Sequence, residues 1–278
     1  MASLRELKKR IRSAQNIGKV TKALQMISAI RMRKAQTDAL LSRPYATELV
    51  DTLRKLPAGD VQNPLLQGND STKQLIIIVA PDRGLAGPLI TNLYRVTSRF
   101  CKGKDIEAIT LGRKGASIAM RSKVPLVADY PANQLDTLAN NVVDQYRAGK
   151  YNSVWISYAK YINTMTQQPE VVQFLPVNLA NVVGEQAATT DPQAIYTFEP
   201  SPAQVLDYVV TEYLKSTLAQ ILKDALAAEH SARFVAMKNA YDNATNIVKE
   251  LNLVYNKTRQ EKITNEISDI ASATLFSN

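Results

Sequence analysis

The stretch that decides the fold runs from Ala203 to Asn278; it begins AQVLDYVVTEYLKSTLAQILKDALAAEH and ends NKTRQEKITNEISDIASATLFSN. None of its 76 residues is glycine or proline, the two residues that break helices most strongly. A continuous helix of about 70 residues would be roughly 105 Å long, far beyond the helices of ordinary globular domains. We therefore expect one long helix here, with a mechanical role.

The other end of the chain has the same compositional bias. The first 43 residues contain no proline and a single glycine, Gly18, whereas all 12 prolines and the other nine glycines lie between residues 44 and 202. We expect Pro44 to kink or interrupt the N-terminal helix, and Pro57 with Gly59 to end it. The sequence thus predicts three parts: helices over 1–56 and 203–278, and a domain over 70–200 between them.

Apolar residues recur every three or four positions in both terminal arms, which places them on one face of each helix. Each apolar face needs a partner, so we expect the arms to pair as an irregular antiparallel coiled coil. In the N-terminal arm these residues are Leu4, Leu7, Ile11, Ala14, Ile17, Val20, Leu24 and Ile27. In the C-terminal arm they are Val210, Leu214, Leu218, Ile221, Ala225, Ala228, Ala232 and Val235, then Ala244, Ile247, Leu251 and Val254, then Ile263, Ile267, Ile270 and Thr274.

Short apolar runs alternate with helical patterns in the middle of the chain. We expect strands at 74–80, 106–111, 153–159 and 170–177. The helical patterns fall near 87–100, 113–121 and 134–148. Strands that alternate with helices are typical of an α/β domain with a mostly parallel sheet.

The formal charge of +9 is confined to one part of the chain. Residues 1–55 hold 13 Lys or Arg and 4 Asp or Glu, a net charge of +9, and residues 56–278 hold 21 of each. This arm is therefore expected to meet an acidic partner: a carboxylate-rich protein loop, a nucleic acid or an anionic membrane. The alternative is a solvated basic face without a partner.

Motifs for catalysis or metal binding are weak. The loop APDRGLAG, Ala80 to Gly87, stands where a phosphate-binding turn would, but it lacks the GxGxxG pattern and no GKS or GKT follows. His230 and Cys101 are each the only residue of their type, so a cysteine-based zinc site and an internal disulfide are excluded. We predict no catalytic residue, no cofactor and no metal.

The run YNKTRQEKITNEISD, Tyr255 to Asp269, resembles the C-terminal signature of the gamma subunit of F-type ATP synthases, with matches at Ile263, Thr264, Glu266 and Asp269. The resemblance covers both arms and much of the middle. Its further matches follow in collinear order at Arg10–Ser13, Asn16, Lys19–Ala23, Met32–Gln36, Ser42–Ala46, Asp82–Leu85, Phe198–Pro200, Glu229–Arg233 and Ala236–Ala240.

The resemblance implies a fold and a role. The fold would be a long antiparallel coiled coil of the two terminal helices with a Rossmann-like α/β middle domain. The coiled coil would turn inside a hexamer of alpha and beta subunits, while the middle domain meets the epsilon subunit and the c-ring. Proton flow would turn this shaft, which carries no catalytic residue. The implied location is peripheral, on the cytoplasmic face of a bacterial plasma membrane or another energy-coupling membrane.

Three contact sites are also implied by the resemblance, and for each residue the alternative is plain coiled-coil surface or seam. The family pattern breaks from Thr274 on, and Leu24 stands where many members have Met. The implied beta-subunit catch comprises Arg259, Gln260, Thr264 and Glu266. The implied contact with the acidic lever loop of the beta subunit comprises Lys19, Lys22, Leu24 and Met26. The implied tip bearing, in a hydrophobic sleeve, comprises Ile267, Ile270, Leu275 and Phe276.

Two other classes of function remain open on the residues alone. A coiled-coil nucleic-acid-binding protein would use the basic arm, although no Phe, Tyr or Trp precedes Tyr45 to stack on bases. A nucleotide-binding α/β enzyme would need its ligand at residues 82–87. No run approaches 18 consecutive apolar residues and no secretory signal is visible, so we expect neither a membrane-spanning helix nor export.

Overall fold

The structure, a computed structural model, describes residues 3–55, 63–178 and 198–275, with side chains for all of these except Arg43 and 271–275. The expected helix end at Pro57 and Gly59 therefore lies outside the described residues. Backbone contacts divide the chain into two units. The first, here the coiled-coil unit, is Met1–Ser28 with Arg233–Asn278; the second, here the sheet unit, is Ala29–Ala232.

Two long helices, α1 (Leu4–Lys55, 52 residues) and α6 (Pro202–Leu275, 74 residues), contribute to both units. The Glu6 backbone N–H donates to Ser3 Oγ at 3.2 Å, which caps the start of α1. Helix α1 continues through Pro44, so an interruption there is wrong. Pro44 lies on an exposed face, where water can satisfy the carbonyl that loses its helical hydrogen bond.

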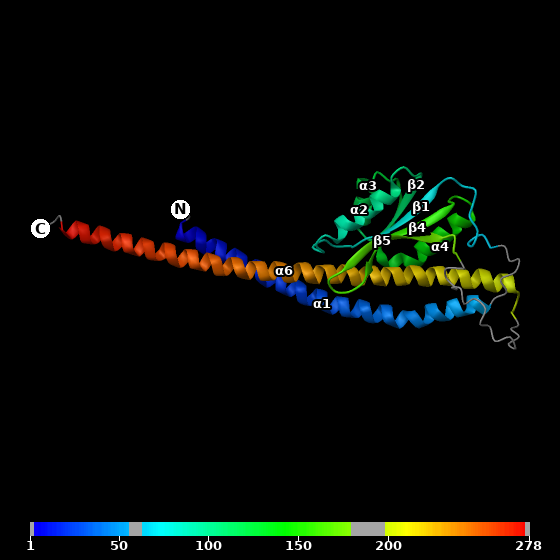
Figure 1. Cartoon of the computed structure of the whole chain (residues 1–278), viewed down its shortest axis with the longest axis horizontal. Coiled ribbons are helices and arrows are strands. Elements are labelled where there is room, and N and C mark those ends of the chain that lie inside the picture. Colours follow the sequence, from blue (N-terminus) through cyan, green and yellow to red (C-terminus); the bar gives the residue numbers. More distant parts are fainter. Residues whose placement is uncertain (1–2, 56–62, 179–197, 276–278) are drawn as a thin grey trace. The chain divides into compact units, whose positions relative to one another are not determined.

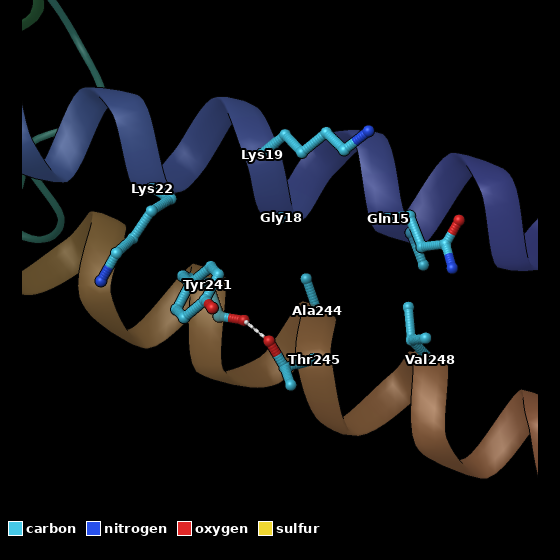
Figure 2. A pocket seen from close by; sticks show the side chains of 9 residues that line it. Gln15, Gly18, Lys19, Lys22, Tyr241, Ala244, Thr245 and Val248 are labelled. Carbon is cyan, nitrogen blue, oxygen red and sulfur yellow. Dashed lines mark hydrogen bonds between the residues drawn. The ribbon is translucent and has the colours of Figure 1, made fainter.

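In the coiled-coil unit, the buried positions follow a strict heptad. On α1, the buried residues are Leu7, Ile11, Ala14, Gly18, Thr21 and Ser28, with the half-buried Gln25 filling the remaining step. On α6, Met237 and Ala244 are buried, and Tyr241, Val248, Leu251 and Tyr255 are half-buried at the same spacing. The helices run antiparallel, with Gly18 facing Ala244 (Figure 2). The predicted pairing of the two arms is therefore confirmed.

The predicted seam of this coiled coil is wrong in its middle part. Ile17, Val20 and Ile27 are 54%, 59% and 47% exposed, and on α6 Ile247 and Val254 are 48% and 49% exposed. The seam instead takes small or polar residues such as Gly18 and Thr21, because only small side chains let two helices approach closely. Two stripes with the same spacing lie side by side on α1, and the more apolar one faces solvent.

The sheet unit holds a five-stranded sheet in the order β3-β2-β1-β4-β5 (Figure 1). The strands β1 to β4 are parallel and β5 is antiparallel to β4. The elements are β1 (Gln74–Val79), α2 (Leu89–Cys101), β2 (Ile106–Leu111), α3 (Gly115–Arg121), β3 (Leu126–Tyr130), the 3-10 turn η1 (Ala132–Gln134), α4 (Leu135–Arg147), β4 (Ser153–Tyr161) and β5 (Gln167–Leu175). The α/β class and the mostly parallel sheet are confirmed.

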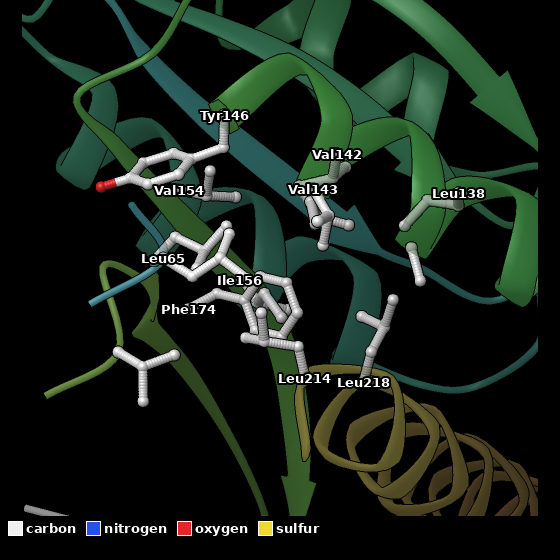
Figure 3. Close-up of a cluster of buried hydrophobic side chains, with 14 of the residues drawn as sticks. Leu65, Leu138, Val142, Val143, Tyr146, Val154, Ile156, Phe174, Leu214 and Leu218 are labelled. Carbon is white, nitrogen blue, oxygen red and sulfur yellow. The ribbon is translucent and has the colours of Figure 1, made fainter. Parts of the chain in front are cut away.

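Helices cover both faces of this sheet (Figure 1). Ile76 and Ile78 of β1 point to α2 and α3, where they pack with Leu93 and Ile118. The alternate residues of β1 point to the other face, which α4 and the N-terminal half of α6 cover. That second core is larger, and Figure 3 shows its packing around Leu65, Leu138, Val142, Val143, Tyr146, Val154, Ile156, Phe174, Leu214 and Leu218. Period-two alternation along β1 thus builds three layers.

Strand β3 is the one strand of the described sheet that the sequence did not predict. Its five residues, LVADY, lie between Pro125 and Pro131 and occupy an edge of the sheet. Its apolar run, Leu126–Ala128, is only three residues long, and the flanking prolines suggest a loop rather than a strand.

Hydrogen bonds tie both long helices to each other and to the sheet within this unit. Ser42 Oγ donates to Gln220 Oε1 at 2.7 Å, which links α1 to α6. Gln36 Nε2 donates to Tyr161 Oη at 2.6 Å, and Ser231 Oγ donates to the Thr164 carbonyl at 2.8 Å. Over the described ranges, no helix has the length and apolarity needed to cross a membrane.

Candidate functional site

The coiled-coil unit carries most of the predicted contact residues, and two of them, Lys19 and Lys22, border a hollow between α1 and α6 (Figure 2). The hollow measures about 630 Å³. It is wide because Gly18 has no side chain and because Ala244 lies opposite. Its lining comprises Ala14, Gln15, Gly18, Lys19 and Lys22 of α1 and Tyr241, Ala244, Thr245 and Val248 of α6.

Positive charge and one aromatic ring set the chemistry of this hollow. Lys22 Nζ lies 4.8 Å from the centroid of the Tyr241 ring, a cation–π contact worth about 0.5–1 kcal/mol at an exposed site. Thr245 Oγ1 donates to the Tyr241 carbonyl at 2.9 Å and so is held by its own helix. Lys19 lines the hollow beside Lys22. The arrangement can accept an acidic or apolar group from outside the chain.

The predicted lever-loop residues are not all gathered there. Lys19 and Lys22 line the hollow, whereas Leu24 is half-buried and Met26 is 60% exposed, and neither lines it. Met26 instead belongs to the exposed surface beside Ile27 and Ile30, which are 47% and 69% exposed. The structure thus separates this group into a basic hollow and an apolar surface.

The predicted catch residues are all exposed on α6. Gln260 and Thr264 line a second hollow of about 880 Å³ together with Ser3 and Leu4 of α1. Arg259 and Glu266 do not line it. They are seven residues, about two helical turns, apart and so share a face of α6 that lies roughly 130° around the helix from Gln260 and Thr264. The four residues therefore form two faces rather than one cluster.

Glu266 has a neighbour on its own helix. Lys262 Nζ lies 3.5 Å from Glu266 Oε1, and the two side chains are 63% and 59% exposed. Ion pairs at such exposure contribute little to stability, so Lys262 can release Glu266 to another partner at small cost.

The tip residues are exposed where the structure describes them. Ile267 and Ile270 are 61% and 67% exposed, and Ile263, four residues before Ile267, is 43% exposed. The side chain of Leu275 and the whole of Phe276 lie outside the described residues. An apolar stripe on a helix without a facing helix is unusual for a free surface and points to a covering partner.

The crevice where a doubly wound sheet would hold a nucleotide is filled. Such crevices open where the order of strands reverses, here between the ends of β1 and β4. Helix α6 occupies this place: Ala228 and Ala232 pack against Ala86, Leu89 and Ala159. The hollow left there measures about 20 Å³, about one water molecule.

The loop of residues 80–87 serves the fold. Asp82 Oδ1 accepts the backbone N–H of Arg113 at 3.1 Å, which joins the loop after β1 to the loop after β2. The neighbouring Gly112 has φ +96°, and a Cβ on it would lie 2.1 Å from the Ala80 carbonyl oxygen. These contacts favour the tight structural turn over the phosphate site.

The described part of the chain shows no activated thiol and no metal-binding cluster. Burial raises the pKa of the Cys101 thiol to about 11, so it stays protonated and unreactive at neutral pH. Among the described residues no group of three His, Cys, Asp or Glu could hold a metal ion. His230 lines a small hollow with Arg31, Lys34 and Lys223 and a single carboxylate, Asp38.

Sequence reasoning missed the aromatic contact of Tyr241 and the polar seam beside it. Gly18, Thr21, Gln25 and Ser28 follow Leu7, Ile11 and Ala14 at steps of four and three, so the heptad was present in the sequence. Continuing the alternating steps of four and three strictly from Leu7, whatever the polarity of the residues, leads to this seam.

Comparisons with known proteins agree on one family. The family model described as ATP synthase matches residues 3–274. The ATP synthase gamma chain of Roseiflexus castenholzii is 38% identical over 288 residues, covering 98% of this chain and 97% of the relative. That of Herpetosiphon aurantiacus is 38% identical over the full length of both chains, and that of Dehalococcoides mccartyi is 37% identical with 97% of each covered.

Solved structures show the same fold at low sequence identity. A chain in the rotor of the Euglena gracilis mitochondrial ATP synthase has a TM-score of 0.65 and 17% identity, with 94% of this chain and 98% of that chain covered. A chain in the central stalk and c-ring of the Tetrahymena thermophila enzyme has a TM-score of 0.58 and 20% identity, with 80% and 99% covered.

Proposed function

Since this chain belongs to the ATP synthase gamma-chain family, we propose that it transmits torque as the rotary central-stalk subunit between a proton-driven c-ring and three catalytic beta subunits. The observation that carries this function is the pair of breaker-poor helices, 52 and 74 residues long, that lie antiparallel in the coiled-coil unit. Two packed helices resist bending and twisting better than one. A shaft needs that stiffness, and an enzyme active site does not.

The subunit itself is proposed to be non-catalytic. The filled crevice at the end of β1 and the protonated Cys101 support this assignment within the described residues. Its contribution to ATP synthesis is then mechanical: it sets the order in which the catalytic sites of other subunits act.

The partners of the coiled-coil unit are proposed to be the alpha and beta subunits, arranged as a hexamer around it. Ile17, Val20 and Ile27 offer an apolar surface outside the seam, and the arm that carries them holds the whole excess of positive charge. A partner with apolar side chains and nearby carboxylates would complement both features. The lever-loop contact is proposed at Lys19 and Lys22, which line the basic hollow, and at Leu24 and Met26 outside it.

The catch and the tip remain proposals at particular residues. Gln260 and Thr264 would bond to a beta-subunit loop on one face of α6, and Arg259 and Glu266 on the other. Beyond them, Ile267 and Ile270, with Leu275 and Phe276, would turn in an apolar sleeve. The exposure of the two isoleucines supports this use.

The sheet unit is proposed to meet the epsilon subunit and the c-ring. In that position the subunit is peripheral to the membrane, and we infer the cytoplasmic face of a bacterial plasma membrane as its location. No described feature favours the nucleic-acid alternative: Tyr241, the aromatic residue at the basic hollow, is already engaged by Lys22.

Co-purification tests the proposed function. The tagged chain, produced together with alpha and beta subunits, should bring both down and carry ATPase activity. Ile17→Gln combined with Val20→Gln should weaken this assembly, because the exposed apolar surface is lost while the seam is intact. Met165→Gln, which changes a 74% exposed residue of the sheet unit, is the matched control and should assemble normally. A tagged chain that recovers neither subunit would disprove the assignment.

A further inference from the structure

A small hollow in the sheet unit gathers positive charge from two helices. It measures about 210 Å³ and lies between α1 and α6. Arg31, Lys34 and Asp38 line it from α1, and Lys223 and His230 line it from α6. Ala35 and Leu226 supply its apolar lining; Ala35 is 8% exposed, so the base of the hollow is fixed by packing.

The spacing of these residues makes them converge. Arg31, Lys34 and Asp38 are three and four positions apart, and residues at such steps share one helical face. On α6, Lys223, Leu226 and His230 have the same spacing. Two facing helices therefore present their charged side chains to one volume.

The positive charges in this hollow outnumber the negative ones supplied by the residues that the structure describes. Three cations face one carboxylate, and among the described residues Arg31, Lys34 and Lys223 have no carboxylate within ion-pair distance. Cations held close together without a counter-charge repel one another, and an anion between them removes that cost.

Size and lining restrict the anion. Pockets for drug-sized ligands begin at about 300 Å³, so a volume of about 210 Å³ suits a small anion with its waters. No Phe, Tyr or Trp lines the hollow, so a nucleobase would find only the small imidazole ring of His230 to stack on. An arginine fork and two ammonium groups suit phosphoryl oxygens, which carry more charge than a single carboxylate.

We propose that this hollow binds a small phosphoryl oxyanion, of the inorganic phosphate or pyrophosphate class. Arg31 donates its forked N–H groups, Lys34 and Lys223 supply point charges, and Asp38 limits the affinity by repulsion. Binding of an anion at this site does not depend on torque transmission, so the proposal can be tested separately from the proposed function.

Calorimetric titration of the full chain with pyrophosphate, at constant ionic strength, tests the site. We expect saturable binding of one anion per chain. Lys34→Gln should weaken binding roughly tenfold, as the loss of one charge-assisted contact predicts. Asp38→Asn should tighten binding about threefold, because an exposed repulsion is removed. Lys102→Gln, which changes an exposed lysine elsewhere in the sheet unit, is the control and should bind like the unaltered chain.

The opposite responses of Lys34→Gln and Asp38→Asn distinguish a site from general charge attraction. Non-saturable binding, or binding that Lys34→Gln and Lys102→Gln weaken equally, would mean an adventitious ion only and would overturn the proposal. A parallel arm with phosphatidic acid vesicles identifies the source of the phosphoryl group. Vesicle binding lost in Lys34→Gln points to a lipid headgroup, and pyrophosphate binding without vesicle binding points to a free anion.

Discussion

At the scale of single residues, Gly18 is a position in the seam where a substitution can be expected to stabilise the helix. It lies inside a helix, where glycine is less favourable than alanine by about 0.5–1 kcal/mol. A Cβ at this position would lie 3.7 Å from Ala244 Cβ and 4.0 Å from the Tyr241 ring, which is ordinary van der Waals contact. The close helix approach thus leaves room for one methyl group.

We predict that Gly18→Ala raises the free energy of unfolding by about 0.5–1 kcal/mol, measured by urea unfolding followed by circular dichroism. Gly112→Ala is the opposite case, because its Cβ would lie 2.1 Å from the Ala80 carbonyl oxygen and its φ is +96°. It should lower stability by more than about 2 kcal/mol. A destabilising Gly18→Ala would show that the helices are closer than described.

Glu107 gives the sheet unit a dependence on pH. The Tyr151 hydroxyl donates to Glu107 Oε2 at 2.7 Å, and Lys73 Nζ lies 3.1 Å from Oε1. The hydrogen bond from Tyr151 is the main cause that lowers the pKa of the Glu107 carboxyl. Burial acts in the opposite direction, and the hydrogen bond from Lys73 lowers the pKa further. A carboxyl group with a lowered pKa in the folded state stabilises the fold at pH values above its pKa in the unfolded state. This stabilisation is lost as the pH falls through the pKa of the folded state.

Glu107→Gln should therefore lower stability by about 1 kcal/mol at pH 7, and the deficit should shrink below about pH 4.5. Tyr151→Phe keeps the ring but removes the first donor, which raises the pKa of Glu107 in the folded state, so its acid-induced loss of stability should be smaller and should be complete at a higher pH than in the unaltered chain. Thermal unfolding across this pH range measures both. A deficit for Glu107→Gln that is equally large at pH 3 and pH 7 would contradict the assignment.

At the scale of elements, α1 carries two stripes with different partners. The seam holds Leu7 and Ile11 at 4% and 9% exposure, while Ile17, 54% exposed, belongs to the outer stripe. Ile11→Ala should lower the free energy of unfolding by about 2–4 kcal/mol. Ile17→Ala should change it by less than about 0.5 kcal/mol. Equal costs in urea unfolding of the two variants would contradict the assigned seam.

The sequence predicts the long helices and the α/β layer well, because breaker content and apolar runs are local properties. It fails at Ile17 and Val20 because a spacing of three and four identifies a helical face without saying what covers it. In the isolated chain the more polar stripe pairs, through Gly18 and Thr21. The more apolar stripe stays exposed, as expected for a surface whose partner is another subunit.

The contact sites were harder to predict for the same reason. The positions of Arg259 and Gln260 follow from the family resemblance, but neighbours in sequence do not share a helical face. Strand β3 was missed because its apolar run, Leu126–Ala128, is only three residues long and lies between prolines. The cationic hollow at Arg31 and Lys223 joins residues almost 200 positions apart, which no local pattern could connect.

At the scale of the whole molecule, family membership and the two long helices agree on a mechanical role. The described sheet unit has a Rossmann-like topology whose ligand crevice is filled by α6. Folds of this type often bind nucleotides in this crevice, whereas in this chain the crevice holds α6. This arrangement agrees with the proposal that other subunits carry out catalysis while this one transmits motion.

Rotation is the most direct measurement of this role. Thr91→Cys places a thiol on an exposed position of α2 for attachment of a bead, while the buried Cys101 stays unreactive because its pKa is about 11. In a complex of this chain with immobilised alpha and beta subunits, added ATP should turn the bead continuously in one direction. A bead that stays still while the same complex hydrolyses ATP at its full rate would contradict the account.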